Sequence, residues 1–267
     1  MNVQGDFHVH SPFCPHGTTD PLKLYIENAI ERGLTEISFT EHAPLPESFM
    51  DPTPQKDCGM SKKQTDAYIE AVQQLKLEYK NDITIHLGLE VDYIEGYEKE
   101  TKELLNNYGE YLDDSILSVH LLLTPHDHYV CLDYSSDMFR EIIEQFGSVD
   151  LVYNKYYETI QQAILSDLGV YKPKRVGHLT LIEKFKKRYP AKDNYEATIE
   201  SILELIRTRD LALDINTAGL FKEECKTIYP PFSIIQKAKD KGIKLFPGSD
   251  SHSAETVGRA FDQLKNI

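Results

Sequence analysis

Short apolar runs rich in β-branched residues alternate along the chain with longer segments of helical periodicity. This alternation is typical of βα units built around a parallel sheet. The expected strands are Asp6–His10, Glu36–Thr40, Ile83–Val91, Ser115–Leu121, Arg175–Leu179, Leu211–Asn216 and Lys244–Gly248. No Gly/Ser run, low-complexity tract or internal repeat interrupts the alternation. We therefore predict a single barrel-like α/β domain over residues 1–267.

The segments between these strands carry signals for helices. Asp20 and Pro21 predict the start of one helix, as a capping residue followed by a first-turn proline, and Gly33 predicts its end. Ser61–Lys80 repeats apolar residues at helical spacing, which favours a long amphipathic helix. Further helices are expected at Asp137–Leu168, Asp193–Arg209, Pro231–Lys241 and Ala254–Lys265.

Two segments, Pro44–Met60 and Thr124–Ser136, have the character of insertions, because the first is rich in proline and aspartate and the second in aspartate and tyrosine. Loops carried by a rigid scaffold often supply binding and catalytic residues. We therefore expect both segments to wall an active site on the loop face of the barrel.

Residues that can bind a metal ion stand at the end of almost every expected strand. They are His8 and His10, Glu41 and His42, Glu90, His120, His178, Asp214 with Asn216, and Asp250 with His252. Side chains alternate along a strand, so His8 and His10 point the same way, and the carboxyl ends of barrel strands share one face. Buried imidazole and carboxylate groups are costly unless they are paired or bind a cation. This convergence predicts a metal centre.

The candidate ligands outnumber those of a single metal site. They are His8, His10, His16, His42, Glu90, His120, His178, Asp250 and His252. One zinc ion takes about four ligands, so two or three divalent ions are expected, with Glu90 as the bridging carboxylate. The many imidazoles favour transition metals over magnesium. Cys14 could add a soft ligand, but the harder ligands available favour its role as a small buried residue.

Composition and charge exclude several classes of function. The net charge of -14 leaves no basic excess to neutralise phosphates, so no nucleic-acid partner is expected. The chain shows no signal-peptide pattern and no apolar run near the roughly 20 residues of a membrane span, so no membrane partner is expected. Four scattered cysteines without a Cys-x-x-Cys pair indicate reduced thiols and a cytoplasmic location.

Taken together, several motifs resemble those of a known superfamily. The metal motifs are His8-x-His10, Glu41-His42, Glu90, His120, Gly177-His178 and Gly248-Ser249-Asp250-Ser251-His252, in the order seen in the polymerase and histidinol phosphatase (PHP) superfamily. Further motifs resemble its monofunctional histidinol-phosphate phosphatases: Asn216-Thr217-Ala218-Gly219, Tyr156-Tyr157-Glu158-Thr159 and Tyr229-Pro230-Pro231. The resemblance covers essentially the whole chain. It implies a distorted seven-stranded (β/α)7 barrel of the TIM-like type.

The resemblance also implies a trinuclear metal centre with three sets of ligands. The sets are His8, His10, Glu90 and Asp250; then Glu90, His120 and His178; then His16, His42 and His252. The implied metals are zinc, manganese or iron. The implied substrate is L-histidinol phosphate, a small phosphate monoester, which would be hydrolysed to L-histidinol and phosphate in histidine biosynthesis.

For this reaction we expect a hydroxide that bridges the first two metals to attack phosphorus in line, without a covalent phosphoenzyme. Glu90 would hold those two metals. The leaving alkoxide would take a proton from Asp250, from His252 or from a metal-bound water. Arginine and lysine often recognise phosphate, and the candidates beside the fifth strand are Lys155, Arg175 and Lys184.

The remaining polar residues near the strands receive other interpretations. Glu41 is expected either to orient a histidine or to pair with a base, and Asp92 and Asn216 are expected as hydrogen-bond partners that orient the ligands. His86 shares strand parity with Glu90 but lies further back, which favours a core histidine with its own partner. In the inserted loop we expect solvent exposure or substrate contact for His126 and His128.

Other functions remain open from the sequence alone. A PHP-type phosphodiesterase or nuclease would use the same site but would need a longer basic groove, and the net charge counts against it. A phosphomonoesterase for another substrate would share both site and chemistry. A metal-dependent amidohydrolase shares the His-x-His motif but not Glu90 and His252 in these places. A non-catalytic scaffold would have lost ligands, and none is missing.

Overall fold

Seven parallel strands form the central sheet of the computed structural model, which describes residues 3–266. In sheet order they are β1 (Gly5–Val9), β2 (Glu36–His42), β3 (Thr84–Asp92), β4 (Asp114–Ser118), β7 (Arg175–Val176), β8 (Ala212–Asn216) and β9 (Leu245–Gly248). Sheet order follows chain order, and each neighbouring pair is parallel. The seven predicted strands are confirmed, although β7 is shorter than expected.

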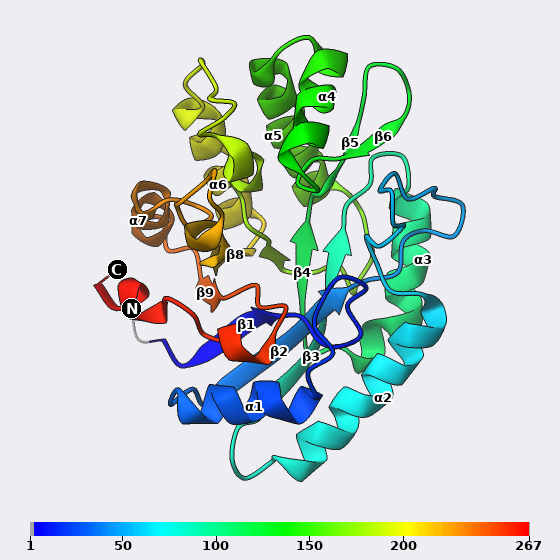
Figure 1. The fold of residues 1–267 in the computed structure, drawn as a ribbon, viewed down its shortest axis with the longest axis vertical. Helices are drawn as coiled ribbons and strands as arrows, with labels where there is room; N and C mark the ends of the chain where they lie inside the picture. The colour runs from blue at the N-terminus through cyan, green and yellow to red at the C-terminus, as the bar shows by residue number, and fades with distance from the viewer. Residues whose placement is uncertain (1–2, 267) are drawn as a thin grey trace.

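The first and last strands, β1 and β9, approach each other and nearly close the sheet into a barrel (Figure 1). The backbone N–H of Asp250 donates to the carbonyl of His8 over 2.8 Å, and the N–H of His10 donates to the carbonyl of Ser251 over 2.8 Å. Both bonds lie just beyond the end of β9. The predicted distorted (β/α)7 barrel is therefore confirmed, with a seam between β1 and β9.

A buried carboxylate, Asp6, joins the two sides of this seam. It accepts hydrogen bonds from the backbone N–H groups of Ser249 and Gly258 at 2.9 and 2.7 Å, and from the Ser249 hydroxyl at 2.5 Å. Asp6 also accepts from the N–H of His8 at 3.3 Å. This one side chain thus accepts from several buried donors that have no acceptor in the strand ladders.

Packing around β3 fixes the central carboxylate of the site. Leu87, Leu89 and Val91 are buried on one face of the strand, while Gly88 and Glu90 occupy the other. A Cβ atom at Gly88 would lie 2.3 Å from the carbonyl oxygen of Asp114, so only glycine allows β4 to pair this closely. The position of Glu90 therefore depends on the glycine two residues before it.

Helices cover the outside of the barrel (Figure 1). They are α1 (Leu22–Glu31), α2 (Lys62–Glu78), α3 (Glu98–Tyr108), α4 (Ser136–Phe146), α5 (Val149–Leu165), α6 (Glu196–Thr208) and α7 (Phe232–Asp240). The long α2 begins with a capping box between Ser61 and Gln64 and packs on β3. Within residues 3–266, every helix is too short or too polar to span a bilayer.

Two helix predictions in the middle of the chain need correction. The single helix expected over Asp137–Leu168 is two helices, because Gly147 takes a left-handed φ of 91° and ends α4. The Ser148 side chain then accepts from the N–H of Leu151 and starts α5. Helix α3 was not predicted.

The helices near the two ends of the chain also differ from expectation. Asp20 does not cap α1, because its carboxylate accepts instead from the N–H of Ala254 at 3.0 Å. The helix expected at Ala254–Lys265 is wrong. It is replaced by two short 3₁₀ segments, which positive φ angles at Gly258 and Ala260 separate.

The two predicted insertions lie on the carboxyl side of the barrel strands. Pro44–Met60 forms a loop without helix or strand. The second contains more order than expected, because β6 (Tyr129–Cys131) pairs antiparallel with β5 (Leu121–Leu123) to make a hairpin. Both segments contribute residues to the pocket described below.

We predict that Asp6→Ala lowers the free energy of unfolding by about 3 kcal/mol, because it leaves buried donors of Ser249 and Gly258 without an acceptor. Urea denaturation of the metal-free protein measures the change. The exposed Asp82 offers a matched control, and Asp82→Ala should alter stability by less than about 0.5 kcal/mol. Equal unfolding midpoints for the two variants would contradict this account of the seam.

Candidate metal centre

The carboxyl ends of the strands surround a pocket of about 660 Å³. Seven of the nine predicted ligands line it: His16, His42, Glu90, His120, His178, Asp250 and His252. The other two, His8 and His10, are fully buried beneath it. The structure thus brings all nine predicted ligands to one place, and the pocket is of a size that binds small molecules.

Glu90 lies at the centre of this cluster. Its Oε2 atom is 3.5 Å from His8 Nε2 and 3.4 Å from His10 Nε2. Its Oε1 atom is 2.9 Å from His178 Nε2 and 3.8 Å from His120 Nε2. His42 Nδ1 is also 3.3 Å from Oε2. The two oxygens therefore face different sets of imidazoles, which is the arrangement that a bridging carboxylate requires.

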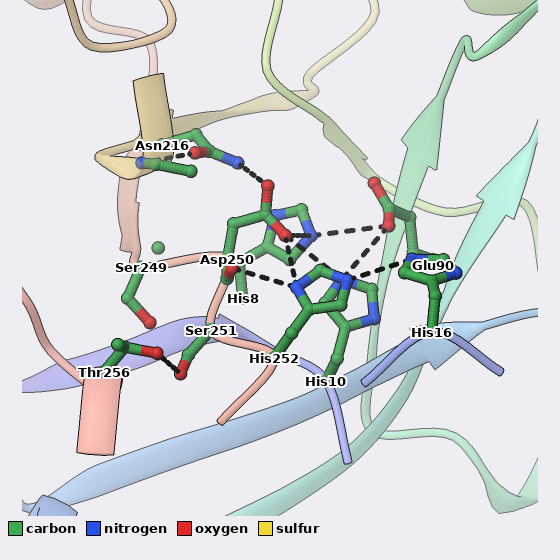
Figure 2. A network of polar contacts seen from close by, with 12 residues as sticks. His8, His10, His16, Glu90, Asn216, Ser249, Asp250, Ser251, His252 and Thr256 are labelled. Atoms are coloured by element: carbon green, nitrogen blue, oxygen red, sulfur yellow. Dashed lines mark hydrogen bonds and ion pairs between the residues drawn. The ribbon is translucent and has the colours of Figure 1, made fainter. Parts of the chain in front are cut away.

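Asp250 faces the same histidines from the last strand, as Figure 2 shows. Its Oδ1 atom is 3.2 Å from His10 Nε2 and 3.8 Å from His8 Nε2. The amide nitrogen of Asn216 donates to its Oδ2 atom over 3.1 Å. Asn216 therefore orients Asp250, as the sequence predicted for an outer hydrogen-bond partner.

His16 and His252 form a second corner of the cluster, nearer to solvent. Their Nε2 atoms lie 3.2 Å apart. The Nδ1 atom of His16 is 3.1 Å from the carbonyl oxygen of Asp57, which belongs to the Pro44–Met60 loop. This loop therefore helps to orient a predicted ligand.

Outer carboxylates hold three of the imidazoles by the ring nitrogen that faces away from Glu90. The pairs are His8 with Asp214 at 2.9 Å, His10 with Glu41 at 3.1 Å and His120 with Asp92 at 2.8 Å. Such a bond fixes the tautomer and leaves the inner nitrogen as the lone pair that a metal takes. The roles expected of Glu41 and Asp92 agree with this geometry, whereas Asp214 had been given none.

The electrostatic environment of the metal-free cluster balances carboxylates against imidazoles: burial lowers the pKa of His8, His10 and His120, but the facing carboxylates raise each of these pKa values above the ordinary one. Burial raises the pKa of Glu90, but the surrounding histidines, His8 above all, hold that pKa well below its usual range. Burial and the charge of His10 lower the pKa of His42 and of His252 well below the ordinary value. The carboxylate is therefore ionised, and these two imidazoles keep free lone pairs.

Unpaired buried nitrogens also fit a metal centre. Within residues 3–266, the buried imidazole nitrogens without a hydrogen-bond partner are His8 Nε2, His10 Nε2, His42 Nδ1 and Nε2, and His178 Nδ1. Leaving such groups unpaired is costly unless a ligand completes them. Three sets of atoms are close enough to hold an ion: His8, His10 and Glu90; Glu90, His120 and His178; and His10, Cys14, His42 and His252.

The third of these sets differs from the predicted one. It contains Cys14 and His10 in place of His16, although His16 borders His252. The buried Cys14 thiol thus lies among the imidazoles. The chemistry of all three sets, imidazole with carboxylate or sulfur, suits divalent transition metals.

Two of the three predicted phosphate contacts are not at the pocket. Arg175 begins β7, so it lies at the opposite end of the strand from His178, where it is buried and bonded to Asp114 at 2.6 Å. Lys155 pairs with Glu95 at 2.6 Å and does not line the pocket. These two expectations therefore need correction.

Three cationic side chains do line the pocket. Lys184 lies in the pocket, as expected of a phosphate contact, and it pairs there with Asp133 at 2.9 Å. Lys222 and Arg259 were not predicted. Both residues lie in segments that follow the carboxyl ends of β8 and β9. A search for basic residues after the strand ends would therefore have found them. Arg259 donates to the carbonyl oxygen of Asp250 over 3.3 Å.

The remaining histidines lie outside the cluster. His86 pairs with Glu36 at 2.8 Å near the start of the sheet, so it has its own partner, although it is half-buried rather than in the core. His126 and His128 stack on each other beside the β5–β6 hairpin and do not line the pocket.

Comparison with known proteins identifies the family to which this chain belongs. A family model of the PHP domain matches residues 6–218. A histidinol-phosphatase of Bacillus subtilis (strain 168) is 47% identical over 259 residues, which is 96% of this chain and 96% of the relative. Relatives of this similarity and coverage share a family.

Solved structures agree with the sequence comparison. A crystal structure of a candidate histidinol phosphatase from Listeria monocytogenes superimposes with a TM-score of 0.93 at 36% identity, covering 97% of this chain and 99% of that one. A histidinol phosphate phosphatase of Lactococcus lactis, solved with zinc, L-histidinol and phosphate, has a TM-score of 0.71 at 20% identity, covering 98% and 91%. The chain belongs to the PHP domain family, in its histidinol-phosphatase branch.

Proposed function

We propose that this chain is a metal-dependent phosphoric monoester hydrolase that converts L-histidinol phosphate and water to L-histidinol and phosphate. The observation that carries the proposal is the cluster of imidazoles around Glu90 at the base of the pocket. It occurs in a chain that is 47% identical, over almost its full length, to a histidinol-phosphatase. The more distant Lactococcus lactis relative holds zinc, L-histidinol and phosphate.

We assign the ligands to three divalent ions, of zinc, manganese or iron. The sets are His8, His10, Glu90 and Asp250; Glu90, His120 and His178; and His16, His42 and His252. Distances between ring nitrogens and carboxylate oxygens support the first two sets, and the 3.2 Å approach of His16 to His252 supports the third. Free thiols support a cytoplasmic place of action.

Divalent ions in these sets would supply a hydroxide at neutral pH and neutralise the oxygens of the phosphate. The side chains of the pocket add binding and proton transfer. Lys184, Lys222 and Arg259 bring positive charge to the phosphate. Asp250, held ionised by the surrounding histidines despite its burial, faces the pocket beside His252. Because neither residue holds a proton of its own in these states, we assign to them the transfer of a proton from a water of the pocket to the leaving alkoxide.

The enzyme should prefer a phosphate monoester over a diester. The pocket is closed at its base, and the chain carries a net charge of -14, so it offers no long basic groove for a polymer. Steady-state phosphate release from L-histidinol phosphate, compared with hydrolysis of bis-p-nitrophenyl phosphate by the same metal-loaded protein, measures this preference. No turnover of the monoester with metals bound would refute the proposed function, and faster diester hydrolysis would favour a phosphodiesterase.

Replacing a proposed metal ligand should remove metal and activity together. His178→Ala should lower the metal content per chain and reduce kcat/KM about 100-fold or more, because the second set loses one of three ligands. Metal analysis by mass spectrometry and steady-state kinetics measure both effects. His86→Ala is the matched control, since His86 pairs with Glu36 away from the cluster. Unchanged metal content in His178→Ala would refute the assignment of the second set.

Removing a pocket cation should weaken phosphate binding. Lys222→Met should raise both KM for the monoester and the inhibition constant of inorganic phosphate about tenfold, because one charge-assisted contact is lost. The exposed Lys226, which pairs with Glu223 outside the pocket, is the matched control. Equal inhibition by phosphate in Lys222→Met and Lys226→Met would contradict the role given to Lys222.

A further inference from the structure

Two cysteines from different inserted segments meet in the wall of the pocket. Cys58 belongs to the Pro44–Met60 loop, and Cys131 ends β6 of the hairpin. Both line the pocket, and the Cys58 thiol lies near enough to that of Cys131 to raise its pKa. Cys58 also packs against the small apolar cluster that contains Cys131. The mechanism proposed above uses neither thiol.

The backbone on both sides holds these thiols together. The N–H of Cys58 donates to Asp51 over 2.9 Å, and Asp51 also binds the N–H and hydroxyl of Thr53, each at 2.8 Å. Cys131 is fixed by its pairing with Leu121 in the hairpin. A disulfide needs two thiols on neighbouring segments of backbone, and the loop and the hairpin bring this pair to one wall of the pocket.

We propose that Cys58 and Cys131 form a reversible disulfide that ties the loop to the hairpin and lowers the activity of the site. This regulation rests on the proposed function. The oxidant is a low-molecular-weight disulfide. The Cys58 thiol first loses its proton, and the thiolate then attacks one sulfur of the oxidant, so that a mixed disulfide forms and the leaving thiolate takes up that proton as the first small thiol. The thiolate of Cys131 then attacks the mixed disulfide, forms the Cys58–Cys131 bond and releases the second small thiol.

The order of attack follows from exposure. Among the four cysteines, Cys58 alone is half-exposed, while Cys14, Cys131 and Cys225 are buried. The neighbouring Cys58 thiol, together with burial, raises the pKa of Cys131 well above its ordinary value, which makes Cys131 a poor first nucleophile. Cys131 therefore acts second, on a disulfide already held beside it.

The cross-link would reach the metal centre through both neighbours of the pair. Asp57, adjacent to Cys58, presents the carbonyl oxygen that orients His16. The Cys131 thiol donates to Asp133 over 3.4 Å, and Asp133 pairs with the pocket residue Lys184. Forming the disulfide removes that donor and fixes the loop, so it changes the support of a proposed ligand and of a pocket cation. Changes in such outer contacts typically cost tenfold or more in metal affinity or activity.

The test treats the zinc-loaded protein with oxidised glutathione and maps the products by peptide mass spectrometry. The expected result is a peptide cross-linked between Cys58 and Cys131, a fall of about tenfold in kcat/KM, and faster loss of zinc to a chelator. Dithiothreitol should reverse all three changes. A lasting glutathione adduct on Cys58 without the cross-linked peptide would overturn the proposal, as would a cross-link that leaves both kinetics and zinc release unchanged.

Serine variants distinguish this disulfide from general oxidation damage. Compared with its own reduced form, Cys58→Ser should show no cross-link and no loss of activity with oxidised glutathione, whereas Cys131→Ser should stop at the glutathione adduct on Cys58 without the cross-link. Cys225→Ser, altered at a buried thiol elsewhere in the fold, should respond like the unmodified chain. Equal sensitivity of Cys58→Ser and Cys225→Ser would overturn the proposal. Should the reduced protein lack phosphatase activity, the proposed function fails, while cross-linking and zinc release still decide the disulfide.

Discussion

The buried carboxylate of Glu90 is the group on which the rest of the site depends. It lies within ion-pair distance of five imidazoles, which come from β1, the ends of β2 and β4, and the segment after β7. A buried negative charge is stable only among positive or donor groups, and buried imidazoles need acceptors or cations for their nitrogens. The imidazoles stabilise the charge of Glu90, and the Glu90 oxygens serve as acceptors for the imidazole nitrogens. The outer carboxylates then fix the rings, so the cluster keeps one arrangement.

Much of the fold followed from periodicity, because parallel strands alternating with helices leave a repeated pattern in the chain. The strand ends were informative for the same reason, since a barrel gathers them on one face. Local backbone geometry was harder to foresee. Gly147 divides a continuous helical pattern, and the left-handed Ala260 interrupts a second segment whose composition predicts a helix. Neither conformation is encoded by hydrophobic spacing.

In the site, the gathering of the candidate ligands was predictable from the sequence, whereas the residues that support them were only partly so. The carboxylate that holds His8 is Asp214, 206 residues away in sequence, and only the closed barrel brings the two together. The prediction that Arg175 contacts phosphate is wrong, because a residue close to His178 along the chain is not necessarily close to the pocket. A strand carries its first and last residues to opposite ends of the barrel, so the rule that located the ligands would also have excluded this arginine.

The seam between β1 and β9 has a consequence for how the protein is made. One side of it carries His8 and His10, and the other carries Asp250 and His252. The first and the last candidate ligands of the cluster therefore leave the ribosome at the beginning and at the end of synthesis, and His8 and His10 lack Asp250 and His252 until the chain is nearly complete. The barrel can close and the cluster can assemble only when the chain is complete. A chain truncated before β9 would therefore form an open barrel that binds less metal.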